Sequence, residues 1–175
     1  KSWKELNNNT LKIINFFREK KITEKDRVAA YTINQIETVE SFLAASAIGA
    51  IWSSCSPDFG TQGVIERFSQ IKPKLLIITD RYYYNGKEIN IIERLPAILK
   101  KIKSIKIVLI INYPGKINLK HKKPKGTKIF YYNRLKNKKE KKFSFKKFDF
   151  DKELAILYSS GTTGKPKCIC HRAGG

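Results

Sequence analysis

The sequence predicts an α/β fold in which helices cover the faces of a layered parallel sheet. Three observations support this class: short apolar runs alternate with segments of helical periodicity, several of these runs are apolar without interruption, and hydrophobic residues make up 41% of the 175 residues. An unbroken apolar run is typical of a strand that is buried on both faces. Ligands of such sheets usually bind beyond the carboxyl ends of the strands.

The first predicted elements are a helix and a strand. Ser2 and Glu5 have the Ser-x-x-Glu spacing of a capping box, and apolar residues then recur at helical spacing. We therefore expect a helix from about Trp3 to Lys20. A short strand is predicted over Val28–Tyr31.

A helix, a strand and another helix are predicted next. Apolar residues recur at helical spacing through 37–47, and Gly49 is expected to end this helix. The apolar run Ala50–Trp52 predicts a second strand. After it, 57–60 predicts a turn and 61–71 a third helix.

The most buried strands are predicted from continuous apolar sequence, over Lys74–Thr79 and Ile107–Ile111. Between them we expect a helix from about Glu88 to Ile102, because isoleucine and leucine residues recur along one side of it. Pro96 lies inside this helix and should kink or delay it. The last strand is predicted over Leu154–Tyr158.

The positive charge is concentrated in one segment. The chain has 36 Lys and Arg against 15 Asp and Glu, a formal net charge of +21, and residues 116–147 hold fourteen of the basic residues and one acid, Glu140. Such a segment is a candidate for nucleic-acid binding. Prolines and glycines interrupt it, however, and it lacks a sustained helical period. We interpret it as a basic surface connection with a short strand over Thr127–Tyr132, and nucleic-acid binding is disfavoured.

Composition also limits the setting of the protein. The longest nearly apolar run, Phe42–Trp52, is about half the roughly 20 residues needed to span a bilayer. An odd number of cysteines favours a reducing, cytoplasmic location. A zinc site of Cys168, Cys170 and His171 is disfavoured, because neighbouring strand residues point to opposite faces. The chain opens on Lys1 and contains no Met, so we expect it to be a piece of a longer protein.

The most informative segment follows the last predicted strand. Residues 158–167 read Tyr-Ser-Ser-Gly-Thr-Thr-Gly-Lys-Pro-Lys. Its hydroxyls and lysines can bind phosphate oxygens, and its glycines let backbone N–H groups approach a ligand closely, which together suit a polyphosphate. The spacing is not that of a Walker A loop. From composition alone, a flexible polar turn is an equally good interpretation.

The order of these ten residues closely resembles the phosphate-binding signature of the adenylate-forming superfamily. The resemblance implies that the loop holds the β- and γ-phosphates of MgATP while a carboxylate attacks the α-phosphate, and that a thiol, usually of coenzyme A, later displaces AMP. Lys165 falls at the variable position of the signature. The residues that match the phosphate cradle are Ser159, Ser160, Gly161, Thr162, Thr163, Gly164 and Lys167.

The resemblance narrows to the acetoacetyl-CoA synthetases, or acetoacetate–CoA ligases. Residues 27–31, 49–60 and 84–87 are similar to the corresponding stretches of these enzymes, and the run Trp-Ser-Ser-Cys-Ser-Pro-Asp-Phe-Gly differs from that of acetyl- and propionyl-CoA synthetases. The implied substrates and cofactors are ATP, Mg²⁺, coenzyme A and acetoacetate. Another short-chain acyl-CoA synthetase, such as acetyl-CoA synthetase, is the nearest alternative. Lys87 is a possible coenzyme A contact, although a solvated surface turn is at least as good an interpretation.

The resemblance also implies a domain organisation. Residues 1–175 correspond to part of the large N-terminal adenylation domain, with the basic connection at about 116–147. Several functional parts of this family lie later in its sequence than the stretch matched here. They are the acidic Mg²⁺ ligand, the adenine and ribose contacts, and the mobile C-terminal domain with its catalytic lysine. We therefore assign no catalytic residue and no metal ligand within this chain, and do not expect it to catalyse alone.

Four further side chains are candidates for roles near the loop. Cys55 has no base spaced to activate it, so buried packing is the better interpretation. Trp52 and Phe59 flank the predicted turn beside the core. For His171, a position against the active site and an ordinary place on a strand are equally plausible.

Overall fold

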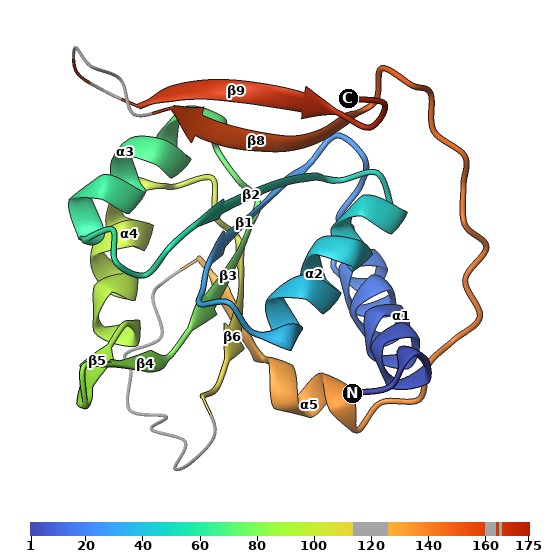
Figure 1. Cartoon of the computed structure of the whole chain (residues 1–175), viewed down its shortest axis with the longest axis horizontal. Helices are drawn as coiled ribbons and strands as arrows, with labels where there is room; N and C mark the ends of the chain where they lie inside the picture. The colour runs from blue at the N-terminus through green and yellow to red at the C-terminus, as the bar shows by residue number, and fades with distance from the viewer. Residues whose placement is uncertain (114–125, 160–163, 165) are drawn as a thin grey trace.

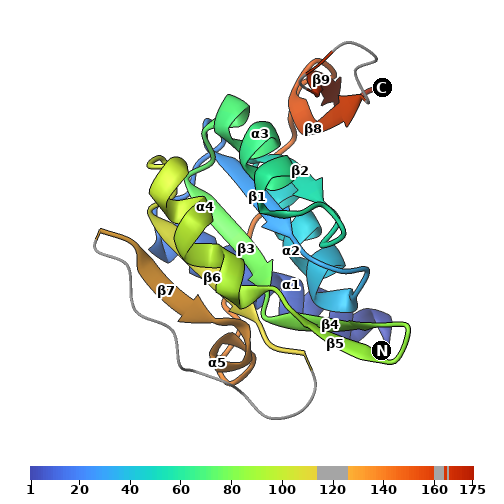
Figure 2. The same ribbon diagram turned by 90° about the vertical axis from the view of Figure 1, so that its left-hand side faces the viewer.

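A computed structural model describes residues 1–113, 126–159, 164 and 166–175. Within them, seven strands form one sheet in the order β7-β6-β3-β1-β2-β8-β9 (Figure 1; β7 is labelled in Figure 2). Neighbouring strands are parallel, except that β8 and β9 pair antiparallel. The predicted α/β class with a parallel sheet is confirmed, with one antiparallel strand added at an edge. The bounds are β1 (Arg27–Tyr31), β2 (Ile51–Cys55), β3 (Leu75–Thr79), β6 (Ile107–Ile111), β7 (Lys128–Tyr131), β8 (Glu153–Ser159) and β9 (Lys167–Arg172).

Helices cover both faces of the sheet, as Figure 2 shows from a second direction. One face carries α1 (Trp3–Glu19), α2 (Ile36–Ala47) and α5 (Tyr132–Lys136), and the other carries α3 (Thr61–Ile71) and α4 (Leu95–Lys101). Each face has its own buried apolar cluster, because alternate residues of the central strands point to opposite sides. Among the described residues, no helix has the length and apolar character needed to cross a membrane.

The predicted capping box begins the first helix. The Ser2 hydroxyl accepts from the backbone N–H of Glu5, and the Glu5 carboxylate accepts from the backbone N–H of Ser2. Each bond satisfies a backbone donor that a helix start leaves unpaired. The predicted helix is thus confirmed, ending one residue earlier than expected.

The central strands confirm the apolar runs that predicted them. Every residue of β3 and β6 is buried, as expected for strands covered on both faces. Strand β2 is longer than predicted, because Ser53, although polar, is fully buried and continues it. Gly49, which follows α2, adopts a φ of 74° in the left-handed region.

The helix predicted from Glu88 to Ile102 is wrong in its first half. Residues 81–90 form a hairpin of two antiparallel strands, β4 (Arg81–Tyr84) and β5 (Lys87–Asn90). Its turn holds Asn85 and Gly86 at φ of 48° and 73°, the conformation that Asn-Gly favours in two-residue hairpins.

The helical part of that segment begins only after the hairpin. A 3₁₀ turn, η1 (Ile92–Arg94), leads into α4. Pro96 lies in the first turn of α4, where its missing N–H has no helical partner to lose. The sequence predicts that Pro96 either kinks this helix or delays its start, and the structure shows the delay.

The described part of the basic segment packs onto the domain. The predicted strand over 127–132 is confirmed as β7, which pairs with β6. Helix α5 follows it and was not predicted. Tyr132 of α5 is buried in the cluster beneath α1 and α2. Lys138 pairs with Glu19 of α1 at 2.9 Å, which adds a second contact between this part of the segment and the fold.

Candidate functional site

The predicted phosphate loop connects β8 to β9. Ser159 ends β8, Lys167 begins β9, and the two residues are directly paired in the antiparallel register. Gly164 is exposed, with a φ of 137° that a side chain would strain. The remaining predicted contacts lie outside the described residues: Ser160, Gly161, Thr162 and Thr163.

The described ends of the loop, Ser159 and Lys167, lie at the carboxyl edge of the parallel sheet. Strand β8 runs parallel to β2, with Trp52 opposite Ala155, so Ser159 lies toward the same edge as the end of β2 at Cys55. This edge is where ligands of open α/β sheets bind. The structure therefore brings Ser159 and Lys167 together at the expected place.

Helix α3 contacts one described residue of the loop, Pro166, through a single side chain. Gln70 Nε2 donates to the backbone carbonyl of Pro166 at 2.9 Å and to that of Glu66 at 2.9 Å. On the same glutamine, Oε1 accepts a weak hydrogen bond from the Cys168 thiol at 3.6 Å. Sequence reasoning missed Gln70, because 96 residues separate it from Pro166.

A buried serine joins β2 to the strand that carries the loop. Ser53 Oγ donates to the backbone carbonyl of Ile156 at 2.8 Å and lies 3.1 Å from the hydroxyl of Tyr158. Burial raises the pKa of Tyr158, so this phenol is neutral at ordinary pH. Ser53 therefore helps to fix the strand that ends at the loop.

A second group of residues fixes the turn after β2. Tyr31, at the end of β1, donates to the carbonyl of Phe59 at 2.6 Å. Arg94 donates to the Tyr31 hydroxyl and to the carbonyl of Pro57, the latter at 3.0 Å. Burial raises the pKa of Tyr31, although the charge of Arg94 opposes the shift. The turn predicted over 57–60 is thus clamped by β1 and η1.

A cavity of about 310 Å³ opens beside this turn, at the carboxyl ends of β1 and β2. Pro57 and Asp58 line one side, and Tyr82 and Tyr84 of the β4–β5 hairpin line another. The Tyr82 hydroxyl donates to Asp58 Oδ1 at 3.0 Å and links the two sides. Lys87 is exposed and pairs with Tyr84 in the hairpin register. The structure thus places Lys87 on the hairpin that forms a wall of the cavity.

The other candidate side chains have mainly packing roles. Burial raises the pKa of the Cys55 thiol to about 12, so it stays protonated and is a poor nucleophile. Trp52 is buried and packs edge-to-face on Phe42, with ring centroids 5.7 Å apart. Phe59 lies under the Arg67 guanidinium, 3.9 Å from its ring centroid. His171 is exposed on β9.

The described residues offer no cluster of metal-binding side chains. Within the described parts of the chain, no three His, Cys, Asp or Glu side chains lie together so as to hold a metal ion. Cys168 and Cys170 are free and exposed on β9.

Known proteins resemble the chain over its whole length. Residues 1–175 match the family of AMP-binding enzymes. Acetoacetyl-CoA synthetase of Gallus gallus is 44% identical over 153 residues, covering 86% of this chain and 23% of that protein. Acetoacetyl-coenzyme A synthetase of Rhizobium meliloti (strain 1021) is 40% identical over 174 residues, covering 99% of this chain and 26% of that protein.

A solved structure agrees with these sequence matches. Acetoacetyl-CoA synthetase from Streptomyces lividans superposes with a TM-score of 0.88 at 32% identity, covering 99% of this chain and 26% of that one. The chain thus spans about a quarter of the length of the curated relatives it matches. It belongs to the AMP-binding family of adenylate-forming enzymes and is homologous to the N-terminal portion of acetoacetyl-CoA synthetases.

Proposed function

We propose that the complete protein is an acetoacetate–CoA ligase and that this chain supplies its ATP phosphate-binding loop. The observation that carries the proposal is the pairing of Ser159 with Lys167 at the carboxyl edge of the sheet. It closes the base of a loop whose sequence matches the phosphate cradle, with Ser160, Gly161, Thr162, Thr163 and Gly164 between the two. The loop's role in binding phosphate is part of this proposal.

The proposed reaction has two steps. A carboxylate oxygen of acetoacetate attacks the α-phosphorus of ATP, the bond to the bridging oxygen breaks, and pyrophosphate leaves with the electron pair. The coenzyme A thiol, losing its proton, then attacks the acyl carbon, and AMP leaves. In the first step the loop's task is electrostatic, because hydroxyls, backbone N–H groups and Lys167 stabilise charge on the phosphate oxygens.

Coenzyme A and Mg²⁺ complete the proposal. Lys87 is exposed on the hairpin beside the 310 Å³ cavity, where its ammonium group can reach a phosphate of coenzyme A. Mg²⁺ accompanies ATP, and no side chain of this chain is assigned to it. We also propose a cytoplasmic location, since Cys55, Cys168 and Cys170 are all free thiols.

The test is ATP–pyrophosphate exchange by the complete protein. We expect exchange with acetoacetate, and Lys167→Ala should lower it by about a hundredfold while the protein stays folded. Lys165→Ala is the matched control, because Lys165 lies in the same loop at the variable position of the signature. Unchanged exchange in Lys167→Ala would remove the phosphate role from this loop. Faster exchange with acetate than with acetoacetate would instead identify another short-chain acyl-CoA synthetase.

A further inference from the structure

A larger cavity lies at the opposite edge of the sheet from the proposed nucleotide site. It measures about 500 Å³ and is formed by the end of α1, the turn before β1, the end of α2 and residues 143–146. These segments precede β1, β2 and β8, so the cavity faces the amino ends of the strands. Its volume is within the range of about 300–1,000 Å³ typical of small-molecule sites.

Apolar side chains form the inner wall. Ile22 is buried in the core cluster, and Ile48 and Phe143 pack against that cluster while lining the cavity. Such a wall gains free energy when it exchanges water for an apolar ligand, at roughly 25 cal/mol per Å² covered.

The segment that contributes Phe143 and Lys146 to the cavity lining contacts the domain on both sides of these residues. The Phe148 ring packs so closely over Gly49 that a Cβ added there would lie 2.6 Å from two ring atoms. Before residues 143–146 in the chain, Lys138 pairs with Glu19. Residues 143–146 therefore lie between two points of the chain that contact the domain, and two of them line the cavity.

Three cations surround the opening. Arg18, Lys25 and Lys146 line the cavity, and all three are exposed. None of them forms an ion pair with a carboxylate of the described residues. One acid, Glu24, also lines the cavity, so the lining carries an excess of positive charge.

We propose that this cavity binds an anionic amphiphile: an apolar body that covers Ile22, Ile48 and Phe143, with one carboxylate or similar acidic head at Arg18 and Lys146. Apolar side chains beside cations that form no ion pair with a described carboxylate favour this class over a neutral apolar molecule or a polyphosphate. The site is separate from the proposed nucleotide loop, and the inference does not depend on the proposed function.

The test is a titration of the 175-residue chain with decanoate, followed by ¹⁵N–¹H NMR. We expect shifts in the amide signals of residues 18–25, 46–49 and 143–147. Decanamide, which has the same body without the charge, should bind more weakly, and the difference should shrink in high salt.

Two variants separate the apolar and the charged contributions. Arg18→Gln with Lys146→Gln should weaken decanoate binding by about tenfold and leave decanamide binding unchanged. Ala47→Leu fills the cavity and should weaken both ligands. The matched control is Lys100→Gln with Lys103→Gln, which removes the same charge beside a cavity on the other face of the sheet.

Three results would overturn the proposal. One is the absence of any shift at millimolar decanoate. Another is a set of shifts confined to the exposed apolar residues of β8 and β9, such as Leu157 and Ile169. The third is an equal loss of decanoate affinity in the lysine control, which would show attraction by net charge alone.

Discussion

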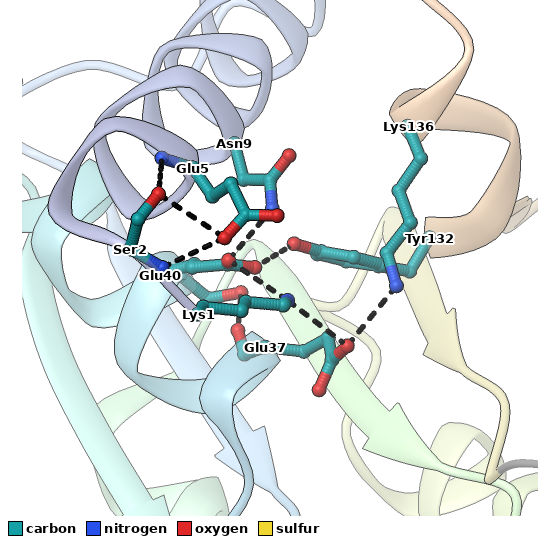
Figure 3. Close-up of polar contacts among 9 residues, drawn as sticks. Lys1, Ser2, Glu5, Asn9, Glu37, Glu40, Tyr132 and Lys136 are labelled. Carbon is teal, nitrogen blue, oxygen red and sulfur yellow. Dashed lines mark hydrogen bonds and ion pairs between the residues drawn. The ribbon is translucent and has the colours of Figure 1, made fainter.

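The phenol of Tyr132 donates a hydrogen bond to the carboxylate of Glu40, and both side chains are buried (Figure 3). Glu40 comes from α2 and Tyr132 from α5. Asn9 of α1 donates from Nδ2 to the same carboxylate at 2.9 Å. Nζ of Lys1, which precedes α1, lies 3.2 Å from the Glu40 carboxylate. One buried charge thus joins three helices, including one from the basic segment.

Removing the phenolic hydroxyl group of Tyr132 should destabilise the domain. Tyr132→Phe keeps the ring but leaves the Glu40 carboxylate without one of its donors, which costs about 1–3 kcal/mol for a buried charged partner. The free energy of unfolding in urea measures this loss. Tyr84→Phe is the control, because that ring is exposed and its change should stay within about 0.5 kcal/mol. Equal stability of Tyr132→Phe and the parent chain would show that the Glu40 carboxylate does not depend on this donor.

Glu37 should make stability depend on pH. Burial alone would raise its pKa, but hydrogen bonds from its own backbone and from Lys136, together with the charges of Lys136 and Lys1, lower it below the usual range. A carboxyl whose pKa is lower in the folded state stabilises the fold above its unfolded pKa of about 4.3. This contribution is lost as pH falls through the folded pKa.

The comparison with Glu37→Gln isolates that effect. At pH 7 the parent chain should be more stable by up to about 1 kcal/mol, because the ion pair with Lys136 at 3.1 Å is only partly buried. The difference should shrink as pH falls below the unfolded pKa and vanish once the carboxyl is protonated in both states. A difference that stays constant from pH 3 to pH 7 would attribute the effect to packing instead of charge.

Two glycines should respond in opposite directions to the same substitution. Gly49 has a φ of 74° and the Phe148 ring where a Cβ would stand, so Gly49→Ala should destabilise by about 1–3 kcal/mol. Gly63 lies inside α3 with only ordinary contacts, the nearest at 3.4 Å, so Gly63→Ala should stabilise by about 0.5–1 kcal/mol. Thermal unfolding of both variants checks the two signs. Destabilisation by Gly63→Ala would contradict the prediction and mean that Arg67 and Phe59 do not accommodate the added methyl group.

Much of the fold was predictable because its signals are local. The unbroken apolar runs at 75–79 and 107–111 are buried on both faces, and the Ser2–Glu5 spacing begins α1 as expected. The hairpin was missed because the helical period of Ile92, Leu95, Leu99 and Ile102 was extended back to Glu88, into residues that form β5. The Asn-Gly turn at 85–86 favours a hairpin over a helix, because it brings the residues on either side of it into antiparallel pairing.

The candidate site was predictable only where it is continuous in sequence. The loop ends Ser159 and Lys167 were identified from one ten-residue run, and the structure pairs them across two strands. Ser53, Gln70 and Arg94 could not be found this way, because their partners come from elements far along the chain. Only the folded sheet brings such residues together, and serine, glutamine and arginine carry no motif of their own.

Gln70 should act as a positioning residue for the proposed loop. Its side chain donates to the Pro166 carbonyl at 2.9 Å, just before the predicted phosphate contact Lys167. In the complete protein, Gln70→Ala should raise the KM for ATP by about threefold to tenfold, since it removes one hydrogen bond worth about 1 kcal/mol, and leave kcat nearly unchanged. Gln62→Ala is the matched control, because Gln62 on the same helix bonds Glu66 and not the loop. An equal rise in KM in both variants would trace the effect to helix α3 as a whole, and an unchanged KM in Gln70→Ala would mean that its bond to Pro166 does not position the loop.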